Sequence, residues 1–232
     1  TEGAVKLARR YGHRHLNGAY EVITTLGSFH GRTLAMVSAS GQTRHQAPYT
    51  PLPSGFVNVE FNNIEALKKA TTEKTCAVML EPVQGEGGDN FFRKEFFEEL
   101  RNITLENDIL LMFDEVQTGF GLTGKFWAHE YYVKPDIVAF GKKSQQCGIM
   151  VSERVDEVED NCFHTSGRIN STWGGNLVDM VRSTQIMKIM EEEKLVNNVS
   201  DRGNYLLKRL YEIQSGFPGL VSNVRGLGLL SS

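Results

Sequence analysis

The sequence has few cysteines, and it lacks a long apolar run. Its three cysteines, Cys76, Cys147 and Cys162, are widely spaced and odd in number, which argues against a disulfide framework and against a zinc site. No apolar run approaches the roughly 20 residues that a helix needs to cross a bilayer, and the amino end lacks the layout of a signal peptide. We therefore expect reduced thiols and residence in the cytoplasm or an organelle matrix.

A surplus of charge of one sign is also absent. The 232 residues include 25 basic and 28 acidic side chains, and 40% of the residues are hydrophobic. These proportions are typical of a globular chain with enough apolar material for a core, and nothing in them points to nucleic-acid binding. Repeats, low-complexity tracts and long linkers are missing too, so we expect one main domain.

Short apolar segments alternate with helical patterns along the chain. Strands are expected at residues 20–25, 56–59, 76–81, 109–114, 136–140 and 149–152. Helices are expected at residues 64–72, 93–107 and 125–132, and longer ones at 176–193 and 195–214. Because strands that alternate with helices favour parallel pairing, the pattern predicts an α/β fold with a largely parallel sheet covered by helices.

Asp114 and Lys142 each follow an apolar segment that is expected to be a buried strand. Ligands of open α/β sheets bind beyond the carboxyl ends of the strands, so this carboxylate and this amine could share one crevice. The pair suits pyridoxal 5'-phosphate. Its aldehyde needs a lysine amine for a Schiff base, and its pyridine nitrogen needs an acidic partner to stay protonated.

Five motifs occur in the order that is typical of one enzyme family. They are S-F-H-G-R-T at 28–33, E-P-V-Q-G-E-G-G at 81–88, F-D-E-V-Q-T-G at 113–119, F-G-K-K at 140–143 and S-T-W-G-G-N at 171–176. By these motifs the chain resembles, almost from end to end, the class III aminotransferases, which are fold-type I enzymes that use pyridoxal phosphate. The resemblance implies a mostly parallel sheet of the seven-stranded type between helices.

The resemblance also implies how the sequence is divided. Residues 1–216 would form the large, cofactor-binding domain, and residues 217–232 would begin the small C-terminal domain. Residues 3–11 start inside a helical pattern, and residues 224–230 stop as a strand begins, so we expect a fragment of a larger enzyme. Whether such a fragment is active stays open.

The residues that the resemblance places around the cofactor are Phe29, His30, Asp114, Val116, Gln117, Lys142, Ser171 and Thr172. Lys142 would bind the aldehyde and shuttle a proton between substrate and cofactor, with the adjacent Lys143 as the alternative. Asp114 would keep the ring nitrogen protonated, and Gln117 would reach the phenolic oxygen. Phe29 and Val116 would cover the two faces of the ring. The hydroxyls of Ser171 and Thr172 would reach the phosphate of the cofactor in the neighbouring subunit, which implies a homodimer with shared sites.

Three further residues would bind the substrate by the same resemblance. Arg32 resembles the arginine that takes a substrate carboxylate, Glu86 the acid that masks a second arginine, and Asn170 lies in a pocket motif. Residues 136–176 look most like L-lysine 6-aminotransferases, whereas the first 45 look more like acetylornithine and ornithine aminotransferases. We expect L-lysine as the donor of its ε-amino group and 2-oxoglutarate as the acceptor; acetylornithine, ornithine and 4-aminobutyrate stay open as donors.

Two alternatives belong to other classes. Residues 119–124 fit the G-x-G-x-x-G pattern of dinucleotide-binding proteins, but four residues separate them from the expected strand end, and the acid expected about 20 residues later is missing. A nicotinamide enzyme is therefore disfavoured. A non-catalytic transaminase remnant is the other alternative, although Lys142, Asp114 and Gln117 are all present in register.

Overall fold

A six-stranded sheet forms the centre of the computed structural model, which describes residues 1–232. The strands lie in the order β2 (Phe56–Val59), β1 (Glu21–Thr25), β3 (Thr75–Leu80), β6 (Leu110–Asp114), β7 (Ile137–Phe140) and β8 (Gly148–Val151). Neighbouring strands are parallel except β7 and β8, which run antiparallel. The α/β class and the mostly parallel sheet are therefore confirmed.

The sheet has six strands here, whereas the resemblance implied the seven-stranded type. The remaining strands do not extend it, because they pair as two separate hairpins. β4 (Val83–Gln84) pairs with β5 (Asn90–Phe91), and β9 (Gly226–Leu227) pairs with β10 (Leu230–Ser231). A strand was expected to begin within residues 224–230, but the pairing of these short strands into hairpins was not expected, since segments of two residues show no periodicity.

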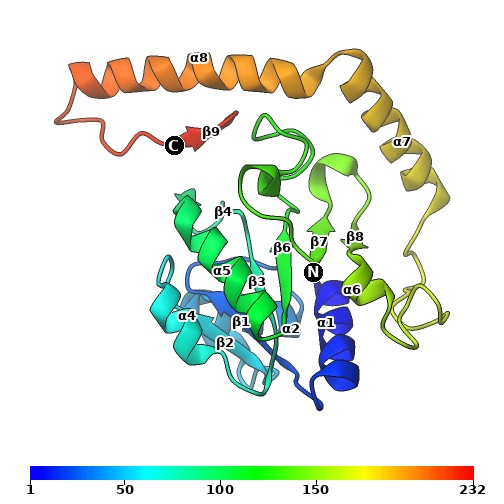
Figure 1. The fold of residues 1–232 in the computed structure, drawn as a ribbon. Coiled ribbons are helices and arrows are strands. Elements are labelled where there is room, and N and C mark those ends of the chain that lie inside the picture. Colours follow the sequence, from blue (N-terminus) through cyan, green and yellow to red (C-terminus); the bar gives the residue numbers. More distant parts are fainter.

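Helices cover both faces of the sheet (Figure 1). α1 (Glu2–His15) and α6 (Glu153–Asp156) lie on one face, and α4 (Ile64–Ala70) and α5 (Lys94–Glu106) lie on the other. The side chains of β3 alternate between the two faces. Ala77 and Met79 belong to the hydrophobic cluster that includes residues of α1, whereas Val78 and Leu80 belong to the cluster that includes residues of α5. Burial on both faces explains why this strand reads as an unbroken apolar run.

The helix expected over residues 125–132 is wrong. Only a short 3-10 turn, η2 (Ala128–Tyr131), forms there. The rings of Phe126 and Trp127 pack against Phe120, and the buried carboxylate of Glu115 accepts a hydrogen bond from the backbone N–H of Ala128. These contacts with residues that precede the segment override its local helical pattern. The other short helical elements are α2 (Leu34–Ala39), α3 (Thr43–Gln46), η1 (Ala47–Tyr49) and η3 (Lys142–Ser144).

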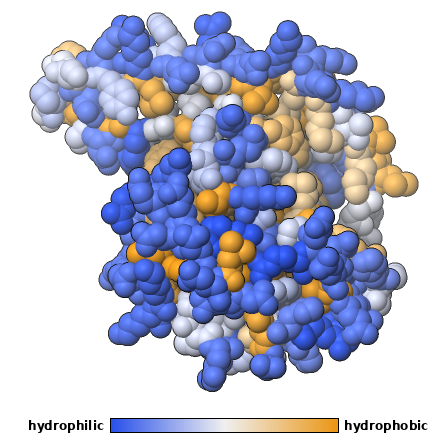
Figure 2. Space-filling view, in the orientation of Figure 1, coloured by the Kyte–Doolittle hydropathy of each residue, from blue (hydrophilic) through white to orange (hydrophobic).

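Two long helices follow the sheet, as the sequence predicts. α7 (Leu177–Glu192) and α8 (Leu195–Gly216) form an arm that passes beside and above the sheet in Figure 1. Each has a single buried residue, Ser183 in α7 and Gly203 in α8. Apolar side chains of α7 such as Leu177 are exposed, and Figure 2 shows apolar surface along this helix. None of the helices combines the length and the apolar character needed to cross a membrane.

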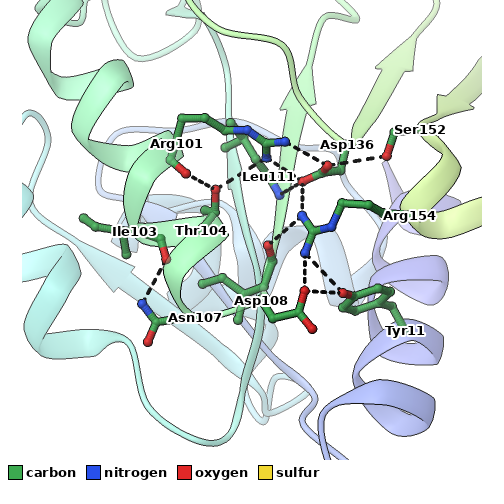
Figure 3. Close-up of polar contacts among 11 residues, drawn as sticks. Tyr11, Arg101, Ile103, Thr104, Asn107, Asp108, Leu111, Asp136, Ser152 and Arg154 are labelled. Carbon is green, nitrogen blue, oxygen red and sulfur yellow. Dashed lines mark hydrogen bonds and ion pairs between the residues drawn. The ribbon is translucent and has the colours of Figure 1, made fainter.

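A buried carboxylate joins several elements at the amino end of β7 (Figure 3). Asp136 is 2% exposed and accepts hydrogen bonds from Arg101 at 2.7 and 3.1 Å, from Arg154 at 3.0 Å and from the backbone N–H of Leu111 at 2.9 Å. Burial by itself raises the pKa of Asp136. The hydrogen bonds from Arg101 and Leu111 and the charges of both arginines outweigh it, so the pKa lies below its ordinary value.

Arg154 extends this cluster to the first helix. Its guanidinium also donates to Asp108 at 2.7 Å and to the hydroxyl of Tyr11 at 3.1 Å. The cluster therefore ties α1, α5, α6 and the starts of β6 and β7 together at the edge opposite the carboxyl ends of the strands.

Candidate active site

A cleft of about 720 Å³ opens at the carboxyl ends of the parallel strands. Its walls include Glu81, which follows β3, Asp114, which ends β6, and Phe140, which ends β7. The loop after β1 contributes Phe29 and His30, and η3 contributes Lys142. The sheet thus brings together residues that are more than 100 positions apart in the sequence.

Asp114 is held at the cleft floor by an imidazole and a backbone amide. Its Oδ2 lies 2.9 Å from Nδ1 of His30, and its Oδ1 accepts a hydrogen bond from the N–H of Val116 at 3.2 Å. Both Asp114 and His30 are buried, with 5% and 2% of their surfaces exposed. A buried carboxylate that is fixed in this way presents its negative charge to any cation that enters the cleft.

The two adjacent lysines point to different sides of Gln117. Nζ of Lys142 donates to Oε1 of Gln117 at 3.0 Å, whereas Nζ of Lys143 donates to the backbone carbonyl of the same residue. Lys142 is exposed and lines the cleft; Lys143 is half-buried and does not line it. Burial, followed by the charge of Lys142, lowers the pKa of Lys143 to about 8. The geometry therefore favours Lys142 over Lys143 as the amine that meets a ligand.

Phe29 and Val116 both contribute to the cleft wall, and Arg32 lies just outside it. The guanidinium of Arg32 lies over the Phe29 ring at 5.3 Å and is exposed. The backbone N–H of Phe29 donates to Oε2 of Glu81 at 3.0 Å. Phe29 is therefore fixed from two sides, by a carboxyl behind it and a guanidinium over its ring.

The structure does not bring every expected residue into the cleft. Ser171 lines it, but the neighbouring Asn170 and Thr172 are exposed and lie outside its wall. Glu86 is likewise exposed and outside the wall, in the turn between β4 and β5. These three residues, like Arg32, can meet a ligand only at the rim or from a neighbouring chain.

Glu115 is a residue of the site that the sequence did not single out. Its buried carboxylate accepts hydrogen bonds from the hydroxyl of Thr118 at 2.7 Å and from the backbone N–H groups of Ala128 and His129 at 3.0 and 2.8 Å. The imidazole Nδ1 of His129 lies 2.9 Å away as well. Glu115 thereby closes the loop that carries Val116 and Gln117. Its position directly after Asp114 was the only available signal.

Glu81 was also not singled out, although it is 4% exposed and lines the cleft. Burial and then the charge of Asp114 raise the pKa of Glu81 to about 8. Hydrogen bonds from the backbone N–H groups of Phe29 and Gly85 and the charge of Lys142 oppose this change only in part. An acid at the end of an apolar segment was the available signal, the same one that drew attention to Asp114.

Comparisons with known proteins agree with this architecture. The family model described as aminotransferase class-III matches residues 1–232. An L-lysine-epsilon aminotransferase of Mycobacterium tuberculosis is 42% identical over 258 residues, which cover 99% of this chain and 57% of that protein. An acetylornithine aminotransferase of Gloeobacter violaceus is 39% identical over 235 residues, which cover 99% of this chain and 58% of that protein.

A solved structure is similar as well. The lysine aminotransferase from M. tuberculosis, solved in its internal aldimine form, matches with a TM-score of 0.91 at 38% identity and covers 99% of this chain and 59% of that chain. The chain therefore spans less than two thirds of the length of the relatives that it matches.

Proposed function

The chain belongs to the class III aminotransferases, and on that basis we propose that it forms the cofactor-binding part of an enzyme that transfers an ω-amino group with pyridoxal 5'-phosphate. One observation carries the proposal: the amine of Lys142 and the carboxylate of Asp114 line the same cleft. The side chain of Gln117 accepts a hydrogen bond from Nζ of Lys142 and so fixes the direction of this amine.

The residues of the cleft fit this cofactor. Asp114 offers a buried negative charge for a protonated ring nitrogen, and Lys142 offers an exposed amine. Phe29 and Val116 provide apolar wall on which a flat ring can pack. Gly3, in the first turn of α1, also lines the cleft, and the amino end of a helix favours a phosphate.

When bound, pyridoxal phosphate supplies an electron sink for the negative charge that remains after a proton leaves the substrate carbon. The chain's own residues move and guide that proton. Lys142 would hold the cofactor's aldehyde carbon, and as a free amine it would take the substrate's proton at Nζ and return it to another carbon. Asp114 would keep the ring nitrogen protonated through its charge, and the side chain of Gln117 accepts a hydrogen bond that orients the amine of Lys142. Phe29 and Val116 exclude water from the faces of the ring.

We propose L-lysine as the donor of its ε-amino group and 2-oxoglutarate as the acceptor. The names of the relatives support the choice of donor, because lysine aminotransferases are among them at 42% identity. An acetylornithine aminotransferase at 39% identity supports acetylornithine as the second candidate, and ornithine and 4-aminobutyrate stay open as further donors. Arg32, Glu86 and Asn170 would contact the substrate from the rim, since all three are exposed. Of these, Arg32 recognises a carboxylate that all the candidate donors share.

We further propose that the chain acts as a homodimer and that residues 217–232 begin a second domain. Trp173 and Leu177 are 82% and 81% exposed, next to the hydroxyls of Ser171 and Thr172. Such large apolar side chains favour burial against a second copy. Sedimentation of the chain and of a Leu177→Asp variant tests the dimer: we expect the variant to sediment as a monomer, and a monomeric parent chain would contradict the proposal.

The cofactor assignment is tested by the visible absorption of the purified chain during titration with pyridoxal phosphate. We expect a visible band with the parent chain and with Lys143→Ala, and none with Lys142→Ala. A band that survives in Lys142→Ala but not in Lys143→Ala would move the assignment to Lys143. No band in any of the three would favour the non-catalytic remnant. Where a band forms, its loss on addition of L-lysine, compared with acetylornithine, ornithine and 4-aminobutyrate, identifies the donor.

A further inference from the structure

Two carboxyl groups stand side by side on the floor of the cleft. β3 and β6 are neighbouring parallel strands in which Leu80 is paired with Phe113, so the next residues, Glu81 and Asp114, lie beside each other at the carboxyl ends of these strands. Neighbouring strands are about 4.8 Å apart, and both carboxyl groups line the cleft with 5% or less of their residue surfaces exposed. Only one of the pair, Asp114, has a role in the proposed reaction.

The partners of the two carboxyl groups differ. Asp114 is hydrogen-bonded to the imidazole of His30 and to the backbone N–H of Val116, whereas Glu81 accepts a hydrogen bond from the backbone N–H of Phe29. The charged groups that act on Glu81 are Asp114 from β6 and Lys142 from η3. Two buried acids at this separation do not both ionise readily in neutral solution, because each negative charge opposes the other; burial and the charge of Asp114 are the two largest causes that raise the pKa of Glu81.

We propose that Glu81 is a positioning residue of this cleft, whose carboxyl group fixes the main chain at Phe29 and sets how much negative charge faces the cofactor's ring nitrogen. Because burial and the charge of Asp114 raise the pKa of Glu81 to about 8, this group holds its proton near pH 7. In alkaline solution Glu81 releases its proton to solvent, and a second negative charge then acts on the ring nitrogen. This inference rests on the proposed function.

The variant Glu81→Gln separates the two parts of this role. A glutamine keeps an oxygen that can accept the hydrogen bond from the N–H of Phe29, but it cannot ionise. Glu81→Ala removes both the acceptor and the charge. Glu106→Gln, on the exposed surface of α5, is the matched control for the loss of one carboxylate.

The test is the ratio of the dissociation constants of Glu81→Gln and the parent chain for pyridoxamine 5'-phosphate, measured from about pH 6.5 to 9.5. This probe has no aldehyde, so Lys142 forms no bond with it. We expect a ratio near one at low pH that rises about three- to tenfold through pH 8, because only the parent gains a charge near the ring nitrogen. An analogue without a ring nitrogen and the Glu106→Gln control should both give flat ratios. A flat ratio for Glu81→Gln overturns the proposal.

A second measurement keeps this inference separate from the proposed function. The carbon NMR signal of the Glu81 carboxyl, assigned by its absence from Glu81→Gln, can be titrated in the chain without any ligand. A midpoint near pH 8 supports the inference, and a midpoint near the ordinary 4.5 overturns it. Failure of the parent chain to bind either cofactor form would count against the proposed function, whereas the NMR midpoint still decides the state of Glu81.

Discussion

Asp136→Asn should destabilise the protein more than the loss of any exposed ion pair. The substitution keeps the shape of the side chain but removes the charge that two arginines and one backbone amide share. Asp136 is 2% exposed and the side chains of Arg101 and Arg154 are 21% and 26% exposed, so both arginines would be left facing a neutral amide in a largely buried site. Removal of one partner from a buried ion pair costs about 3–5 kcal/mol of the free energy of unfolding, which is a large part of the stability of a typical domain.

Asp108→Asn is the matched control for this prediction. Asp108 also pairs with Arg154, at 2.7 Å, but 63% of its side chain is exposed. An exposed ion pair contributes about 1 kcal/mol or less, so this variant should unfold at nearly the same urea concentration as the parent. Urea titrations followed by far-UV circular dichroism measure both free energies of unfolding. A loss below about 1 kcal/mol for Asp136→Asn, or equal losses for the two variants, would refute the reasoning.

The same variant has a defined dependence on pH. The pKa of Asp136 is lowered from 3.8 in the folded protein, so the unfolded chain binds the proton more readily. The stability that the ionised group contributes is therefore complete above pH 3.8 and is lost as the pH falls through the lowered value. The difference in free energy of unfolding between the parent and Asp136→Asn should therefore stay constant from neutral pH down to about pH 3.8. It should shrink as the pH falls further, through the lowered pKa of Asp136.

Three further predictions concern stability. Between pH 5 and 8 the parent should lose about 4 kcal/mol of its free energy of unfolding, whereas Glu81→Gln should not show this loss. The reason is that the pKa of Glu81 is 4.5 in the unfolded chain and about 8 in the folded one, so the unfolded chain releases its proton first. If thermal unfolding gave the same dependence of stability on pH for both proteins, the prediction would be contradicted. Gly12→Ala should destabilise by about 3 kcal/mol, since the added carbon would lie 2.1 Å from the carbonyl oxygen of Ala19, whereas Gly216→Ala, with no atom within 4 Å, should be neutral in urea titration. Glu115→Gln should cost about 2 kcal/mol and change the near-UV circular dichroism of the adjacent aromatic residues, and an unchanged spectrum would count against its role in closing the loop.

The centre of the sheet could be predicted from the sequence because β3 and β6 are buried on both faces. Apolar runs such as 109–114 end at turn or polar residues, and the structure places β6 at Leu110–Asp114, one residue shorter. The same rule located Asp114 and Lys142, since strand ends in a parallel sheet meet at one edge. Local pattern and long-range packing agree at these positions.

The parts that could not be predicted depend on contacts between distant residues. The loop from Glu115 to Ala128 is shaped by one carboxylate that bonds backbone groups 13 and 14 positions later, which no periodicity reveals. Glu81 and Asp114 look alike as acids after apolar runs, and only the pairing of β3 with β6 shows that they are neighbours. The exposure of Asn170 and Thr172 depends on the path of an irregular segment, and irregular segments carry little sequence signal.

The first helix packs against elements that follow much later in the sequence. Its apolar stripe, which includes Val5, Leu7 and Tyr11, packs on β3, β7 and α6, and the hydroxyl of Tyr11 meets an arginine 143 positions later. A ribosome completes this helix long before the residues that cover it exist. Throughout that interval the stripe faces water, so chaperones that hold apolar segments should act on the nascent chain until α6 emerges, and refolding of the finished chain should be slow.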